Sequence, residues 1–227
     1  ALGDASPWWN QTATLLSSRL GMDMNRQTIP IHPRVATTLG GIATDEHGRA
    51  ISGKWSRWFT GLYAAGDAAC SGLHGAGLIA GNRLLDALAG GAAAGEHAAE
   101  YAANASFTGR GSLETALGAG EADLDLTLVS AEGAVQRLGT IQNRLLEIMN
   151  SKVSYTRDAT GLESAIEELQ NLSRDAENLH VDDPSRLYNS NLLATRRLQG
   201  AIRMGIATAQ SALIRTESRG THQRSDF

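Results

Sequence analysis

The sequence is poor in cysteine and lysine and contains no long apolar run. Its one cysteine, Cys70, excludes an internal disulfide and favours a reducing compartment. Only two lysines occur, Lys54 and Lys152, and arginine supplies the remaining positive charge. No stretch of about 18 apolar residues exists, so no transmembrane helix is predicted. No signal peptide opens the chain, and its abrupt start and stop favour a fragment of a longer protein.

The length and charge set the class of protein. A chain of 227 residues is long enough for a sizeable core and one or two domains. Its net charge is -4, which argues against nucleic-acid binding through bulk positive charge. The histidines lack the spacing of metal ligands, so no metal site is expected.

The first 60 residues contain one helix and several short extended segments. Ser6-Pro7 is a typical helix start, and Gly21 ends the helical spacing. Residues 29–35 are predicted to be extended and 42–44 to form a short strand, with a hairpin turn at 46–48. Residues 54–59 are expected to form a loop over the next strand.

The most informative stretch follows. Residues 61–67 predict a buried strand that ends at the acidic residue Asp67, and a glycine-rich loop follows it at 71–76. A helix is predicted over 82–103 despite three internal glycines, since a smooth Ala/Gly face permits close approach to a sheet. The polar, glycine-rich stretch 107–120 is predicted to be a domain boundary.

The rest of the chain predicts three amphipathic helices. Apolar residues recur at helical spacing over 135–148, over 162–179 and over 193–213, where Asn189 or Ser190 caps the third helix. Helices of this kind bury their apolar faces against one another, so an antiparallel bundle is expected.

One competing interpretation of the loop is a dinucleotide fingerprint. Residues 75–80 fit G-x-G-x-x-A. That fingerprint needs a strand directly before it and an acidic residue at the end of a second strand about 20 positions on. Here Glu96 and Glu100 lie at that distance, inside the predicted helix, so the match carries little weight.

A flavin site explains the same residues better. The Asp67 carboxylate can accept a hydrogen bond from a hydroxyl, and glycines let the backbone approach a flat ring. The amides near Arg83, Leu84 and Leu85 are expected to lack intrahelical partners and to donate to a flavin carbonyl. The alternative is that Asp67 merely caps a turn.

The order of the motifs resembles a known family. Residues 29–33 and 39–42, the Gly61 to Asp67 run and Leu73-His74-Gly75-Ala76 are followed far downstream by Glu217-Ser218-Arg219-Gly220-Thr221-His222. This pattern resembles the flavoprotein subunit of succinate dehydrogenase and fumarate reductase, with L-aspartate oxidase as a relative. The resemblance implies FAD as the cofactor, with Gly66, Asp67, Asn82, Arg83 and Leu84 as its binding residues.

The resemblance also implies a fold of α/β plus all-α class. Residues 1–22 would be the end of the capping-domain region, and residues 23–104 the second part of an FAD-binding domain of the two-dinucleotide type. Residues 105–217 would form a three-helix bundle domain, and residues 218–227 would begin a C-terminal tail. The family's pyrophosphate-binding fingerprint and its proton-shuttling arginine would lie outside this chain, so the catalytic residues are unknown and the isolated chain is expected to be inactive.

The sequence departs from the family at the substrate site. Ala36 stands where the family has a carboxylate-binding histidine, and Leu78 stands where it has the arginine that binds the dicarboxylate. Arg83 replaces a serine. Leucine cannot form the guanidinium-carboxylate pair, so the succinate or fumarate substrate is in doubt. His74 is a candidate substrate-site residue or a structural hydrogen-bonding residue.

Two smaller expectations concern Cys70 and the motif near the C-terminus. Cys70 is expected to be a buried small residue. Glu217, Arg219 and His222 are expected to form a polar network between domains, or to reach the flavin.

The leading hypothesis is therefore part of an FAD-dependent oxidoreductase that transfers hydride between flavin and a dicarboxylate-like substrate. The alternatives are a catalytically degenerate family member or assembly partner, and a flavoenzyme with a less anionic substrate. The expected partners are the rest of the flavoprotein subunit and an iron-sulfur subunit, with no nucleic acid. The expected location is the cytoplasm, or the inner face of the cytoplasmic membrane as a peripheral protein.

Overall fold

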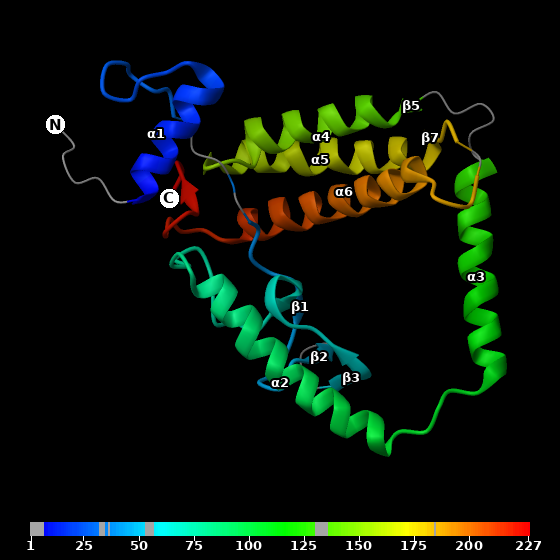
Figure 1. Cartoon of the computed structure of the whole chain (residues 1–227). Coiled ribbons are helices and arrows are strands. Elements are labelled where there is room, and N and C mark those ends of the chain that lie inside the picture. The colour runs from blue at the N-terminus through cyan, green and yellow to red at the C-terminus, as the bar shows by residue number, and fades with distance from the viewer. Residues whose placement is uncertain (1–6, 32–34, 36, 53–56, 130–135, 184) are drawn as a thin grey trace. The chain divides into compact units, whose positions relative to one another are not determined.

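The computed structural model describes residues 7–31, 35, 37–52, 57–129, 136–183 and 185–227. The chain divides into two compact units, residues 1–36 and residues 37–227, which we describe separately. The fold is mixed α/β, with long helices and short strands (Figure 1).

The first unit contains one helix, α1, which spans Pro7–Leu20. Its end is fixed by Gly21, whose φ of 63° is a left-handed conformation that glycine adopts readily. The amide of Gly21 donates to Ser17 O at 3.1 Å, and the amide of Met22 donates to Leu16 O at 3.3 Å. The predicted helix is confirmed; its expected cap, Ser6, lies outside the described residues.

The second unit begins with four short strands. They are β1 (Ile42–Ala43), β2 (Arg49–Ser52), β3 (Arg57–Tyr63) and β4 (Ala69–Cys70). β1 pairs with β4 in parallel, and β2 pairs with β3 in antiparallel orientation. The predicted turn at 46–48 is confirmed, since Gly48 has a φ of 70° and its amide donates to Asp45 O at 3.1 Å.

Two expectations for this region are wrong. Residues 57–59 are not a loop, because they form the start of β3 and pair with β2. Trp58 is held there by its indole Nε1, which donates to Asp45 Oδ2 at 3.1 Å, and by the Arg49 guanidinium 4.3 Å from its ring centroid. β3 is also mostly exposed, although α2 contacts its end: Tyr63 Oη lies 2.8 Å from His97 Nδ1, and Ala64, which follows β3, is buried.

Helix α2 spans Asn82–Asn104, as predicted. Small residues bring it close to the strands: a Cβ placed on Gly48 would lie 2.6 Å from Ala94 Cβ, and one on Gly66 would lie 3.1 Å from Ala87 Cβ. The close approach therefore depends on alanines of the helix facing glycines of the strand region. The stretch 107–120, where the domain boundary is predicted, is helical from its fourth residue, since α3 spans Arg110–Val129.

The remaining residues form three long helices, joined by short strands and a 3-10 turn. The helices are α4 (Leu138–Lys152), α5 (Ala159–Asp175) and α6 (Ser190–Ile214). The other elements are β5 (Gln136–Arg137), β6 (Thr156–Arg157), η2 (Ala176–Asn178), β7 (Leu179–His180) and β8 (Gln223–Arg224). β5 pairs with β7 and β6 with β8, both in parallel.

Helices α4, α5 and α6 lie side by side and share one apolar core (Figure 1). The buried members include Ile141, Leu145, Ile148, Leu162, Leu169, Leu172, Leu198, Ile202 and Ala209. These residues belong to the three predicted stripes, although Leu193 of the third stripe is half exposed. The predicted cap of α6 is confirmed, since Asn189 Oδ1 accepts from the Leu192 amide at 2.8 Å.

The segment after α6 is fastened to this core by a buried arginine. Arg224 is 4% exposed, and its Nη1 donates to Ala212 O at 2.9 Å and to Leu213 O at 3.1 Å. Its Nη2 bonds Asp226 Oδ2 at 2.7 Å, and this pairing holds the pKa of Asp226 well below its usual range. Arg224 thus holds the segment that follows α6 against the C-terminal end of that helix.

None of the helices in the described part of the chain is long and apolar enough to cross a membrane.

We expect Ile202→Val to lower the free energy of unfolding by about 1 kcal/mol, because it removes one methylene from a fully buried side chain. Chemical denaturation measures the change. Ile214→Val is the matched control in the same helix, since Ile214 is 81% exposed, and it should change little. Equal effects of the two changes would contradict the shared core.

Candidate functional site

A shallow hollow, open to solvent, lies in the second unit between the strands and the start of α2. The lining residues are Thr38, Leu39, Gly40, Gly66, Asp67, Ala69, Cys70, Ser71, Gly72, His74, Leu78, Arg83 and Asp86. They belong to four segments of the sequence, residues 38–40, 66–72, 74–78 and 83–86.

Asp67 lies at one wall of the hollow, in the 3-10 turn η1 (Gly66–Ala68) that follows β3. Gly66 has a φ of 60°, so the turn needs a residue that tolerates the left-handed conformation. The structure brings five of the predicted site residues to this hollow: Gly66, Asp67, His74, Leu78 and Arg83. Asn82 and Leu84, predicted with them, are not among its lining residues.

The strongest polar contact in the hollow joins Asp67 to Arg83. Arg83 Nε donates to Asp67 Oδ1 at 2.7 Å and to Oδ2 at 2.8 Å, and Arg83 Nη2 also bonds Oδ2. The hydrogen bonds from Arg83, reinforced by its charge, lower the pKa of Asp67 against a desolvation that would raise it. Both residues were predicted from the sequence, but their pairing, which spans 16 positions, was not. The sequence feature that could have indicated the pairing is that Asp67 precedes and Arg83 follows the same glycine-rich loop.

The start of α2 differs from the expectation in one respect. The amides of Leu84 and Leu85 were expected to be free, but both donate to Gly81 O, at 3.2 and 3.3 Å. They are engaged because Gly81, with a φ of 91°, turns its carbonyl along the first turn. Among the described residues, no hydrogen bond is recorded for the Arg83 amide, so this amide remains as a donor toward a ligand.

Of the two positions predicted to depart from the family pattern, Leu78 belongs to the described residues and Ala36 does not. Leu78 lines the hollow, half-buried, and its amide donates to Gly75 O at 3.0 Å. Ala36 lies outside the described residues. His74 is half-buried at the hollow, which agrees with either role considered for it.

Two further findings concern potential reactive or metal-binding groups. Cys70 is exposed rather than buried, because β4 pairs with β1 on one side and borders the hollow on the other. Within the described ranges, no three His, Cys, Asp or Glu side chains gather closely enough to hold a metal ion.

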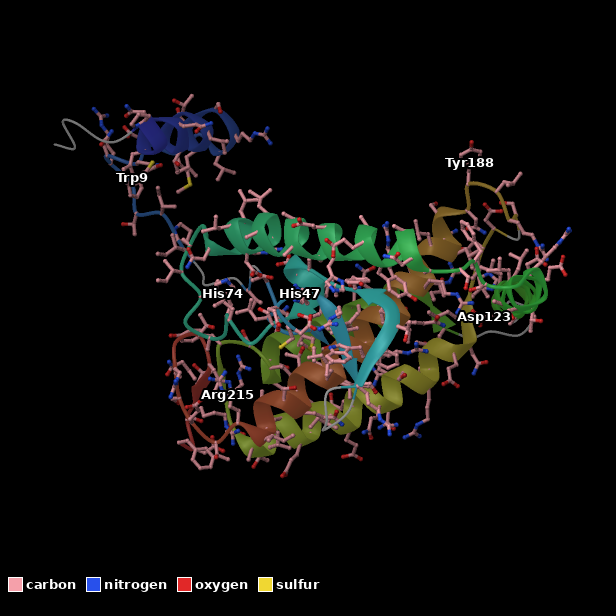
Figure 2. The ribbon with its side chains drawn as sticks, turned by 90° about the horizontal axis from the view of Figure 1, so that it is seen from below. Trp9, His47, His74, Asp123, Tyr188 and Arg215 are labelled. Carbon is pink, nitrogen blue, oxygen red and sulfur yellow. The ribbon has the colours of Figure 1, made fainter. Side chains whose placement is uncertain are left out.

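A second contact ties the loop of the hollow to the segment after α6. The amide of Thr221 donates to Ala76 O at 2.9 Å, and Thr221 Oγ1 donates to the same oxygen at 3.2 Å. Gly220 has a φ of 56°, and a Cβ there would overlap the Ala76 carbonyl. Figure 2 shows His74 and Arg215, which belong to the two segments that this contact joins.

Glu217, Arg219 and His222 were expected to form a polar network between domains or to reach the flavin. The contacts that follow lie within residues 215–222. Glu217 bonds Arg215 at 2.7 Å and Arg219 at 3.3 Å. His222 is buried, which lowers its pKa, and its Nε2 lies 3.1 Å from Arg215 O. A carbonyl only accepts, so Nε2 carries the proton. Gly220 and Thr221, between these residues, make the contact with the loop at Ala76.

The residues of the hollow fit FAD in three respects. Asp67 supplies an ionised acceptor suited to a ribityl hydroxyl, and the Arg83 amide supplies a donor at a helix start. Three lining glycines, Gly40, Gly66 and Gly72, adopt positive φ. Added Cβ atoms at Gly40 and Gly72 would meet nothing within 4 Å, so the backbone there is open to a flat ring.

Comparisons with known proteins agree with this site. A profile described as an FAD binding domain matches residues 6–84, and one described as fumarate reductase flavoprotein C-term matches residues 142–227. The fumarate reductase flavoprotein subunit of Mycobacterium tuberculosis is 32% identical over 204 residues, covering 88% of this chain and 34% of the relative. The mitochondrial succinate dehydrogenase [ubiquinone] flavoprotein subunit of Oryza sativa is 31% identical over 232 residues, covering 100% of this chain and 35% of the relative.

Solved structures give the same result. A mutant FrdA chain of Escherichia coli quinol fumarate reductase superposes with a TM-score of 0.85 at 28% identity, over 99% of this chain and 36% of that one. An apo Sdh1 complex of Mycobacterium smegmatis gives 0.76 at 27% identity, over 95% and 35%. The chain is thus a flavoprotein segment whose cofactor is FAD. It belongs to the fumarate reductase and succinate dehydrogenase flavoprotein subunit family, and it spans about a third of the length of the curated relatives it matches.

Proposed function

We propose that the chain forms part of an FAD-dependent oxidoreductase flavoprotein subunit, in which hydride passes between flavin and a dicarboxylate-like substrate. The observation that carries the proposal is the glycine-lined hollow with Asp67 on one wall and the start of α2 beside it. Bound FAD would supply the redox chemistry, while the protein positions it.

Each residue of the site has a specific part in this proposal. Asp67 accepts a hydrogen bond from a ribityl hydroxyl, and Gly66 gives its turn the required conformation. The amide of Arg83 would donate to the flavin, and the positive end of α2 would favour negative charge on it. Asn82 and Leu84 support this helix start, and His74 lies where a substrate or the flavin would contact it.

The domain organisation follows the same proposal. Residues 23–104 belong to the FAD-binding domain and residues 1–22 to the end of a capping region. Residues 105–217 form a three-helix domain, supported by the core that α4, α5 and α6 share, with α3 attached through Arg196 Nη2, which donates to Asp123 O at 2.9 Å. Residues 218–227 lead out of this domain after contacting it through Arg224.

Partners are proposed by analogy with the relatives. Similar solved chains come from a quinol fumarate reductase and from a complex named Sdh1. We propose that this chain likewise works within the rest of a flavoprotein subunit and beside an iron-sulfur subunit, either in the cytoplasm or peripherally at the inner face of the cytoplasmic membrane.

A second candidate is a degenerate family member or assembly partner that does not turn over dicarboxylates. The half-buried Leu78 favours it, since leucine replaces the family's guanidinium in the hollow. A third is a flavoenzyme with a less anionic substrate. The absorbance spectrum of the full-length protein separates the degenerate member from the two enzyme candidates, because substrate-dependent bleaching of the flavin bands requires an enzyme.

We expect Asp67→Asn in the full-length protein to weaken FAD binding about tenfold or more, because an ionised acceptor forms the stronger hydrogen bond to a hydroxyl. Fluorescence titration of the apoprotein with FAD measures the dissociation constant. Asp175→Asn is the control, since it removes another exposed carboxylate paired with arginine, Arg144, in the helical region. Unchanged affinity in Asp67→Asn would reject the assigned FAD site.

A further inference from the structure

Arg83 places a guanidinium against the predicted FAD ligand. Its Nε bonds both oxygens of Asp67 and its Nη2 bonds one of them. No other hydrogen-bond partner of the Asp67 carboxylate is recorded in the described part of the chain. The orientation of this half-exposed side chain therefore depends on Arg83.

We propose that Arg83 is a positioning residue of the FAD site, which fixes the orientation of the Asp67 carboxylate for a hydroxyl of the ribityl chain. This inference rests on the proposed function, since it assumes that FAD occupies the hollow.

The pair leaves room for the ligand on both partners. An ionised carboxylate offers about four lone-pair positions, so Asp67 can accept a hydroxyl while it binds Arg83. A guanidinium has five N–H donors, and the pair uses only those on Nε and Nη2. Because Arg83 belongs to the first turn of α2, the pair also links the ribityl site to the helix start that faces the flavin.

The charges in the hollow favour positioning over substrate binding. Asp67 and Asp86 bring two negative charges to the lining, and Arg83 brings one positive charge. Arg83 is already neutralised by Asp67, so it is a poor replacement for the cation that the family has at the position of Leu78. The role that remains for Arg83 is toward Asp67.

The test uses the full-length flavoprotein and FAD titration of its apo form. We expect Arg83→Ser to weaken FAD binding about tenfold at pH 7, because Asp67 loses its charge-assisted bonds. Arg83→Lys should recover part of the loss, since lysine keeps the charge without the planar fork. Arg110→Ser is the matched control, since Arg110 starts α3 and pairs with Glu114 at 2.8 Å. It should leave affinity unchanged.

The pH profile provides a second readout. Arg83 holds the pKa of Asp67 below its usual range, and His74 and Asp86, the other titratable groups of the hollow, are the same in the unchanged protein and in Arg83→Ser, so the difference between the two pH profiles reports on Asp67. In Arg83→Ser the pKa of Asp67 rises back toward its ordinary value, so the affinity of the variant should fall further on acidification than that of the unchanged protein.

A double-mutant cycle shows whether Arg83 acts through Asp67. In the Asp67→Asn background, Arg83→Ser should change FAD affinity less than about twofold. Additive effects, or tighter binding in Arg83→Ser because the guanidinium had competed with the ribityl chain, would overturn the inference. If Asp67→Asn alone leaves affinity unchanged, the proposed FAD site fails and the inference with it. If Asp67→Asn weakens binding and Arg83→Ser does not, only the inference fails.

Discussion

Succinate oxidation and fumarate reduction by the full-length flavoprotein are expected to be about a hundredfold to ten-thousandfold less efficient than in a family member with both carboxylate-binding residues. The resemblance to the family assigns Ala36 and Leu78 to those two positions, and this assignment remains a prediction from the sequence. Each lost charge-assisted hydrogen bond costs about 1.5–3 kcal/mol, and two losses together give that range of rates. Steady-state assays of both reactions measure the deficit.

The converse change should restore activity. We expect Ala36→His/Leu78→Arg to raise the efficiency at least tenfold, because the guanidinium would enter the hollow that Leu78 lines. Ile79→Arg is the control, since Ile79 is the next residue but is 69% exposed and does not line the hollow. Efficient wild-type turnover with no gain in the double variant would show that another residue, such as Arg83, binds the carboxylates.

Gly220→Ala is expected to destabilise the protein by about 2–5 kcal/mol. Alanine pays about 1–2 kcal/mol for the left-handed conformation at a φ of 56°. Its Cβ would also overlap the backbone of Ala76, which no side-chain rotation can relieve, and overpacking of this kind costs about 1–3 kcal/mol. Denaturant unfolding gives the stability, and hydrogen exchange should show the Thr221 amide losing its protection.

The control for this change has the opposite sign. Gly200 lies inside α6, where an added Cβ meets nothing within 4 Å. Gly200→Ala should therefore stabilise the helix by up to about 1 kcal/mol. Loss of stability in both variants, or in neither, would contradict the steric argument at Gly220.

The elements of this fold could be predicted where the signal is local. Pro7 and Gly21 mark the ends of α1, and Asn189 caps α6, because these effects involve residues a few positions apart. The loop expected at 57–59 is a strand because pairing with β2 and the Trp58 contact to Asp45 outweigh the local pattern. The helix at 110 was missed because its glycines weaken the local preference.

The residues of the candidate site could be predicted from the sequence, but the contacts between them could not. Asp67 and Leu78 could be named from motifs. The Asp67–Arg83 pair, the contact of Thr221 with Ala76 and the engagement of the Leu85 amide depend on how distant segments meet, which spacing alone does not reveal.

The short parallel pairings and the Ala76 contact have a consequence for folding order. β6 and β8 join residues 67 positions apart at Thr156 and Gln223, and Thr221 reaches back over 145 positions to Ala76. Contacts of such high sequence separation must overcome the entropy of closing long loops, so they are expected to form late and to slow folding. Helices α4 and α5 are neighbours in the sequence and can pack together early. During synthesis, the loop at 71–76 would therefore reach its final geometry only after residues 220–224 have been made.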